Sequence, residues 1–169
     1  VNNNEKERSN ILCNCDYSRL NKKVVSKYLD DIFKYPLIYL TPKRGVRYMY
    51  ANCNNKGHFD IPKVIIGESG MCNAINDYSG KYGMTQDAFG IKIDSYEEGE
   101  NILKALKNEE FKQIIKESCS WSNFRIDWRL FLDFKKYWWK DFVKPQDIKI
   151  IINNQQSVNN QQSVNNQQS

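Results

Sequence analysis

The sequence has a single histidine, His58, and lacks the apolar run of about 20 residues that a membrane-spanning helix requires. A Ser-His-Asp or Cys-His catalytic set would therefore have to use His58, and no nucleophile elbow surrounds Ser69 or Cys72. The Walker-type phosphate loop, the Gly-x-Gly cofactor loop and the Asn-Pro-Pro-Tyr-type methyltransferase motif are also absent. We therefore expect no catalytic residue, no cofactor and no membrane partner, and we interpret His58 as a loop histidine.

The cysteines are poorly spaced for a metal site. Cys13 and Cys15 form a Cys-x-Cys pair, while Cys53, Cys72 and Cys119 are scattered. A structural zinc site needs Cys pairs two to four residues apart, joined by a second Cys or His pair, which the lone histidine does not supply. We expect reduced thiols in an intracellular, cytoplasmic protein and no metal, with a metal site and disulfides as the alternatives.

Length and composition predict one folded domain with polar ends. The chain has 169 residues, 40% of them hydrophobic and 27% charged, which suits a globular domain that folds alone. We expect residues 1–15 to be a flexible polar segment without signal-peptide character, and residues 16–152 to form the domain. The Asn-Asn-Gln-Gln-Ser-Val repeat in residues 153–169 predicts a disordered, low-complexity tail.

Strand patterns occupy the middle of the chain. A hairpin is predicted over Tyr35–Tyr50, because Thr41-Pro42-Lys43-Arg44-Gly45 supplies turn chemistry and the residues after it alternate at the period of a half-buried strand. Lys63–Ile66 and Ala88–Ile93 predict two further strands. The stretch from Met71 to Gly83 is rich in turn formers and predicts a loop.

Helical patterns follow these strands. Ser95 and Glu98 form a capping box, which predicts a helix that ends near Lys107 and a second helix that continues to about Ser118. Residues 17–33 have weak helical spacing and are a helix or a linker. The predicted fold is α+β, with a small, mostly antiparallel sheet and two to three helices packed on one of its faces.

All four tryptophans lie between Ser118 and Phe142. At about 100° per residue, Asp127–Phe142 can be drawn as one helix in which Asp133 pairs with Arg129 and Lys136. Aromatic side chains dominate burial energetics, so the segment is interpreted as a core helix. The alternative is that part of this aromatic surface receives a protein partner. The partner would contact the two adjacent indoles, those of Trp138 and Trp139.

Two basic segments flank an acidic helical one, and this asymmetry is compatible with an anionic partner. The predicted hairpin displays Lys43 and Arg44 at its turn, and Arg47 points to the face opposite the tyrosines. A DNA-binding role would use cations for phosphates and other polar groups for sugars or base edges. The predicted phosphate contacts are Lys43, Arg44, Arg47 and Lys63, and the predicted sugar or base contacts are Tyr48, Asn123 and Arg125.

One ordered set of motifs resembles a known family. Ile61-Pro62-Lys63-Val64-Ile65-Ile66 is followed by a Gly/Asn/Asp-rich loop, the strand around Tyr82–Ile91, the helix Asn101–Asn108 and a Trp-rich segment. This order resembles the C-terminal target-recognition region of N6-adenine DNA methyltransferases and related restriction–modification enzymes. The resemblance implies recognition of double-stranded DNA without catalysis, because the methyl-transferring domain lies outside this chain. The Asn-rich composition resembles orphan proteins of large DNA viruses, which implies host cytoplasm or the virion.

Three functional hypotheses follow. The first is a non-catalytic DNA-binding module, and the second is a protein-interaction or virion-associated protein that uses the aromatic surface. The third is a divalent-metal nuclease, because Asp147-Ile148-Lys149 has the acid-x-Lys spacing of such enzymes on a possible strand. Glu110-Phe111-Lys112 has the same spacing, but it lies on a predicted helix where the geometry is wrong.

Overall fold

Strands occupy the first part of the chain and helices the second. The structure is a computed structural model that describes residues 7–13, 16–118 and 125–144. Its strands are β1 (Ile11–Leu12), β2 (Val25–Ser26), β3 (Tyr35–Leu40), β4 (Arg47–Ala51), β5 (Lys63–Gly67), β6 (Gly70–Asp77), β7 (Gly83–Met84) and β8 (Ala88–Lys92). Its helices are α1 (Tyr96–Lys107), α2 (Glu109–Ser118), the single-turn α3 (Arg129–Leu132) and the 3₁₀ turn η2 (Trp138–Asp141). The predicted α+β class is confirmed.

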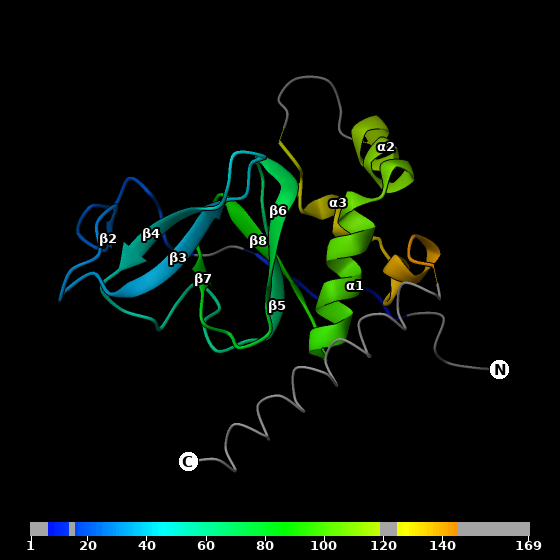
Figure 1. The fold of residues 1–169 in the computed structure, drawn as a ribbon. Coiled ribbons are helices and arrows are strands. Elements are labelled where there is room, and N and C mark those ends of the chain that lie inside the picture. The colour runs from blue at the N-terminus through cyan, green and yellow to red at the C-terminus, as the bar shows by residue number, and fades with distance from the viewer. Residues whose placement is uncertain (1–6, 14–15, 119–124, 145–169) are drawn as a thin grey trace, which may run out of the picture.

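The strands form two sheets, where one was predicted. The first sheet has the order β1-β8-β5-β6, and the second has the order β2-β4-β3-β7. Pairing is antiparallel throughout, except that β7 runs parallel to β3. The predicted hairpin is confirmed as β3–β4, but it does not join the strands β5 and β8. Figure 1 shows the second sheet beside the first, with α1 on the far side of the first sheet.

The central strand β5 explains this layering. Each of its five residues is buried, because β6 and β8 flank it and both of its faces are covered. Val64 and Ile66 pack with the helices, whereas Ile65 packs with Ile38 and Met84 of the second sheet. The short β-branched run therefore forms a strand buried on both faces, as its sequence predicts.

Local signals set the ends of α1 and α2 as predicted. The Ser95 hydroxyl accepts a hydrogen bond from the Glu98 amide at 3.1 Å, and the Glu98 carboxylate accepts one from the Asp94 amide at 2.8 Å. Asn108 then separates the helices, because its amide donates to Ala105 and its side-chain oxygen accepts from the Phe111 amide at 3.1 Å. The Ser95 cap and the break are confirmed, while the reciprocal bond to Glu98 comes from the Asp94 amide and not from the Ser95 amide of a standard capping box.

Two segments differ from the prediction. Residues 70–77, expected as a loop, form β6, because they pair along β5 and α1 packs against them. The Asn76 side chain donates to the Tyr96 carbonyl and to Glu100, which ties the strand to the helix. For residues 17–33 a helix and a linker were the two alternatives, and the helix is not found: the short strand β2 and a series of turns occupy this segment.

The Trp-rich segment is not one helix, which corrects the prediction for Asp127–Phe142. It contains α3 and η2, and Tyr137 between them has φ of 64°, a left-handed conformation that ends any α-helix there. The expected ion pairs also differ: Asp133 pairs with Arg8, and Arg129 pairs with Asp127. An apolar pattern on all sides suits any segment that is buried on several sides, so it does not require a helix.

The N-terminal segment is part of the fold from residue 7, earlier than predicted. β1 pairs with β8, and Arg8 forms a β-bridge with Lys135 of the Trp-rich segment. The domain therefore includes residues that had been assigned to a flexible end, whereas residues 153–169 lie outside the part that the structure describes. Within the described ranges, no helix is both long and apolar enough to cross a bilayer.

The Thr41 hydroxyl connects the two sheets. It accepts a hydrogen bond from the Gly67 amide at 2.8 Å and donates one to the Gly70 carbonyl at 2.6 Å. A Cβ atom at Gly67 would lie 2.5 Å from the Thr41 nitrogen, so only glycine permits this approach. The β3–β4 turn is therefore fixed against the β5–β6 turn.

Thr41→Val should lower the free energy of unfolding by about 1–3 kcal/mol, because it leaves the buried Gly67 amide without its acceptor. Urea denaturation followed by circular dichroism measures this change. Thr41→Ser is the matched control, since it keeps the hydroxyl and should cost less. Equal losses in the two variants would contradict a role for the hydroxyl.

Candidate functional site

The β3–β4 turn carries exposed positive charge. Lys43, Arg44 and Arg47 are all exposed, and none of them pairs with a carboxylate that the structure describes. The turn is held by the Gly45 amide, which donates to the Pro42 carbonyl at 3.0 Å. An anion could approach the three cations without displacing an ion pair of the described residues, so their positive charge is available to a ligand.

Tyr48 extends this surface along β4. Its ring is 39% exposed and lies 5.8 Å from the ring of Tyr82, over which Lys81 places its ammonium at 5.3 Å. Burial and the neighbouring Tyr82 raise the pKa of Tyr48, so its phenol is neutral at physiological pH. We call the set Lys43, Arg44, Arg47, Tyr48, Lys81 and Tyr82 the hairpin patch. Sequence reasoning missed Lys81 and Tyr82.

The two faces of β4 meet at a free edge. Strand alternation places Arg47 and Tyr48 on opposite faces of β4, as predicted. The short strand β2 pairs only with Tyr50 and Ala51, so among the named strands the first half of β4 has β3 as its sole neighbour. A ligand that approaches this edge can therefore reach side chains from both faces.

Lys63 does not belong to the patch, and its predicted phosphate contact is wrong. Its side chain is fully buried on β5, where the ammonium lies 2.9 Å from the Asp77 carboxylate and 3.1 Å from the Ile61 carbonyl. The two residues face each other across the β5–β6 pairing. A buried ammonium that already has these partners cannot contact a phosphate outside the protein.

Arg125, a further predicted contact, pairs with carboxylates outside the patch. Arg125 is exposed, but its guanidinium lies 3.2 Å from Asp87 and 3.8 Å from Glu68. Burial raises the pKa of Glu68, an effect that the Arg125 charge opposes. Asn123 lies outside the described residues. The positive charge of Arg125 is therefore largely compensated, unlike that of the three hairpin cations.

Trp138 and Trp139 are directed inward, which corrects their expected role as an exposed partner surface. Each is only 7% exposed, and the Trp138 ring stacks on Phe111 at 4.6 Å. The left-handed residue Tyr137 turns the chain so that both indoles join the main core. The interpretation of this segment as core is therefore confirmed, although its helical form is not.

The remaining predictions concern the cysteines, His58 and the acid-x-Lys motif. Cys13, Cys53 and Cys72 are free thiols, and the His58 ring nitrogen lies 3.0 Å from the Cys13 carbonyl. In these ranges, no group of three or more His, Cys, Asp or Glu side chains could hold a metal ion. The acid-x-Lys candidate at residues 147–149 lies outside them.

Comparison with models of protein families, with curated proteins and with solved structures gave no match for this chain. The resemblance to the methyltransferase recognition region therefore rests on its motifs alone. The motifs include β5 and α1, but the segment around Tyr82–Ile91, expected as one strand, forms β7 and β8 in different sheets, and β6 lies where a loop was expected.

Proposed function

We propose that the protein is a non-catalytic DNA-binding module and that duplex DNA contacts the hairpin patch. One observation carries this proposal: three exposed cations, which have no acidic partner among the described residues, lie at one end of a sheet edge that also carries an exposed tyrosine. The phosphate backbone supplies most of the affinity in non-specific DNA binding, and clustered Lys and Arg residues are its usual contacts.

The turn that carries the cations is well ordered for such contacts. Thr41 links it to the β5–β6 turn, and the Asn73 side chain of β6 donates to the Pro42 carbonyl. A fixed turn loses little conformational entropy when it binds, so its charges contribute more to affinity than charges on an unanchored loop would.

Roles follow from the chemistry of each side chain. Lys43, Arg44 and Arg47 would contact phosphates, whereas Tyr48 would lie near sugars or base edges, with Tyr82 and Lys81 beside it. The resemblance to a target-recognition region supports the same class of ligand. A reducing intracellular compartment, where such a protein would meet DNA, is part of this proposal.

The combined substitution Lys43→Ala, Arg44→Ala and Arg47→Ala should weaken binding of a fluorescent duplex by at least about tenfold at low ionic strength. Fluorescence anisotropy with the full chain measures this effect. The matched control removes three exposed lysines near the helices, Lys107, Lys116 and Lys144, and therefore has the same net charge. Equal weakening by both triple variants would mean that net charge, and not the hairpin, determines binding.

A protein-interaction or virion-associated role is the second candidate. Residues 20–32 favour it, and not the Trp138–Trp139 surface that the sequence indicated. Leu20, Tyr28, Leu29 and Ile32 are 63–89% exposed, and lysines lie between them in the sequence. Large exposed apolar side chains of this kind are typical of interfaces. A partner protein with an apolar surface rimmed by carboxylates would fit this segment. An oligomer detected by light scattering of the purified chain, together with no DNA binding, would favour this role.

A further inference from the structure

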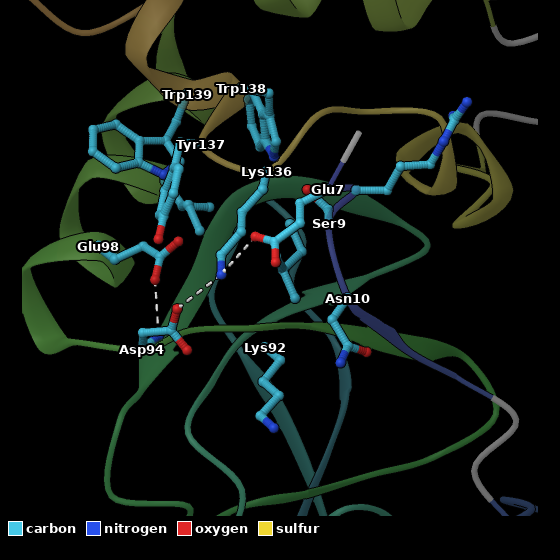
Figure 2. A pocket seen from close by; sticks show the side chains of 13 residues that line it. Glu7, Ser9, Asn10, Lys92, Asp94, Glu98, Lys136, Tyr137, Trp138 and Trp139 are labelled. Atoms are coloured by element: carbon cyan, nitrogen blue, oxygen red, sulfur yellow. Dashed lines mark hydrogen bonds and ion pairs between the residues drawn. The ribbon is translucent and has the colours of Figure 1, made fainter. Parts of the chain in front are cut away.

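A pocket separate from the hairpin patch lies beside the first sheet. It has a volume of about 310 Å³ and is bounded by residues 7–10, the end of β8, the start of α1 and the segment from Lys136 to Trp139. Figure 2 shows side chains from these four segments converging on it. Its size lies at the lower end of the range for small-molecule sites, which begins at about 300 Å³.

Two buried hydrogen-bond donors line this pocket without an acceptor. The indole nitrogens of Trp138 and Trp139 have no hydrogen-bond partner among the residues that the structure describes, although each tryptophan is only 7% exposed. In Figure 2 the Trp138 nitrogen is at the end of the ring nearest Lys136. Buried indole N–H groups normally find an acceptor, because leaving one unpaired is costly. Both nitrogens are closed to solvent in this structure, so the indoles would turn slightly toward a bound ligand whose oxygen atoms supply the missing acceptors.

The backbone at this position is strained. Tyr137 has φ of 64°, which a bulky residue adopts only when its surroundings enforce it. Lys136 is held between Glu7 at 3.2 Å and Asp94 at 3.4 Å, and the Lys140 ammonium lies 4.6 Å from the Tyr137 ring centre. Strain of this kind gathers at ligand sites, where it positions neighbouring groups. The two tryptophans that follow Tyr137 both line the pocket.

The charges around the pocket are balanced. Three carboxylates line it (Glu7, Asp94, Glu98) and three cations (Arg8, Lys92, Lys136). Several already have partners, since Arg8 pairs with Asp133 and Lys136 pairs with two of the carboxylates. An ionic ligand of either sign would meet like charges, whereas a neutral ligand would not. The lining offers both donors and acceptors, which suits hydroxyl groups because each can accept and donate.

We propose that this pocket binds a neutral polyhydroxylated ring, such as a sugar. Its oxygen atoms accept hydrogen bonds from the indole N–H groups of Trp138 and Trp139. Its hydroxyl groups donate to the carboxylates at the rim, and the Asn10 amide and the Lys92 ammonium are placed to contact it at the exposed side. A free saccharide and the ribose of a nucleoside share this chemistry.

The test is an NMR titration of the full chain labelled with ¹⁵N, observed at the four indole N–H signals. Trp138→Phe and Trp139→Phe assign the two relevant signals. The probes are methyl α-D-mannopyranoside, methyl β-D-glucopyranoside, N-acetylglucosamine and adenosine, with sodium phosphate as an ionic comparison. We expect at least one neutral probe to change the chemical shifts of the Trp138 and Trp139 indole signals in a saturable way, while the Trp128 signal stays unchanged. Displacement by the glycosides indicates a saccharide site, and displacement by adenosine alone indicates a nucleoside site.

Variants at the exposed side of the pocket complete the test. Asn10→Ala and Lys92→Ala should each lower the affinity for the probe by roughly three- to tenfold, which corresponds to the loss of one hydrogen bond. Lys116→Ala, on the exposed side of α2, should leave its affinity unchanged. No displacement of either indole signal by any neutral probe up to its solubility would overturn the proposal. So would displacement by phosphate alone, because it would show an anion site.

Discussion

Lys63→Met should lower the free energy of unfolding by about 3–5 kcal/mol, because it leaves the Asp77 carboxylate buried without its cation. The two side chains are 0% and 1% exposed, so water cannot replace the lost partner. Chemical denaturation in urea measures the change. Lys116→Met, at an exposed position on α2, is the matched control and should stay within about 0.5 kcal/mol of the original chain.

The second variant of this series separates charge from packing. Asp77 also accepts hydrogen bonds from the Lys81 and Tyr82 amides at 2.9 and 3.0 Å, so it fixes the turn that positions two members of the hairpin patch. Adding Asp77→Asn to Lys63→Met removes the buried charge while keeping one acceptor oxygen. The double variant should therefore be more stable than Lys63→Met alone. If Lys63→Met lowers the free energy of unfolding by less than about 1 kcal/mol, the Asp77 carboxylate is not left buried and unpaired, which would contradict this account.

Phe131→Ala should cost about 3–5 kcal/mol of unfolding free energy, the usual effect of removing a large core aromatic. The ring is fully buried and contacts four others. Its centroid lies 5.1 Å from that of Phe134, 5.3 Å from Phe89, 6.1 Å from Trp138 and 6.3 Å from Phe111. It therefore connects the Trp-rich segment to the first sheet.

The control for Phe131→Ala lies next to it in α3. Leu132 is 41% exposed, so Leu132→Ala removes a large apolar side chain from the same turn with little change in buried area. We expect a loss below about 1 kcal/mol for this variant. Similar losses for the two variants, measured by thermal and urea denaturation, would contradict the placement of Phe131 in the core.

The sequence predicts local structure correctly where residues close together in the chain determine it. Ser95 with Glu98 predicted the start of α1, and the turn after Thr41 predicted the hairpin. The strand β6 was not predictable in this way, because Gly70–Asp77 is rich in small and polar residues that favour turns. It is a strand because β5 offers hydrogen bonds on one side and α1 covers it.

The same distinction applies to the candidate sites. Lys43, Arg44 and Arg47 were predicted as exposed cations from the turn that precedes β4, whereas Lys63 was misassigned because its acidic partner lies 14 residues away. Recognising the β5–β6 hairpin would have placed Asp77 opposite Lys63. The pocket beside Trp138 depends on contacts between the two ends of the domain, so no local pattern indicates it.

The central claim is that the hairpin patch binds DNA, and the salt dependence of affinity tests it most directly. The full chain and the Lys43/Arg44/Arg47 alanine variant would be titrated with one duplex over a series of salt concentrations. If the three cations each neutralise a phosphate, the logarithmic slope of the full chain should be steeper than that of the variant by about 2.7, or 0.9 per phosphate. Equal slopes, or no binding of the full chain at low salt, would contradict the claim.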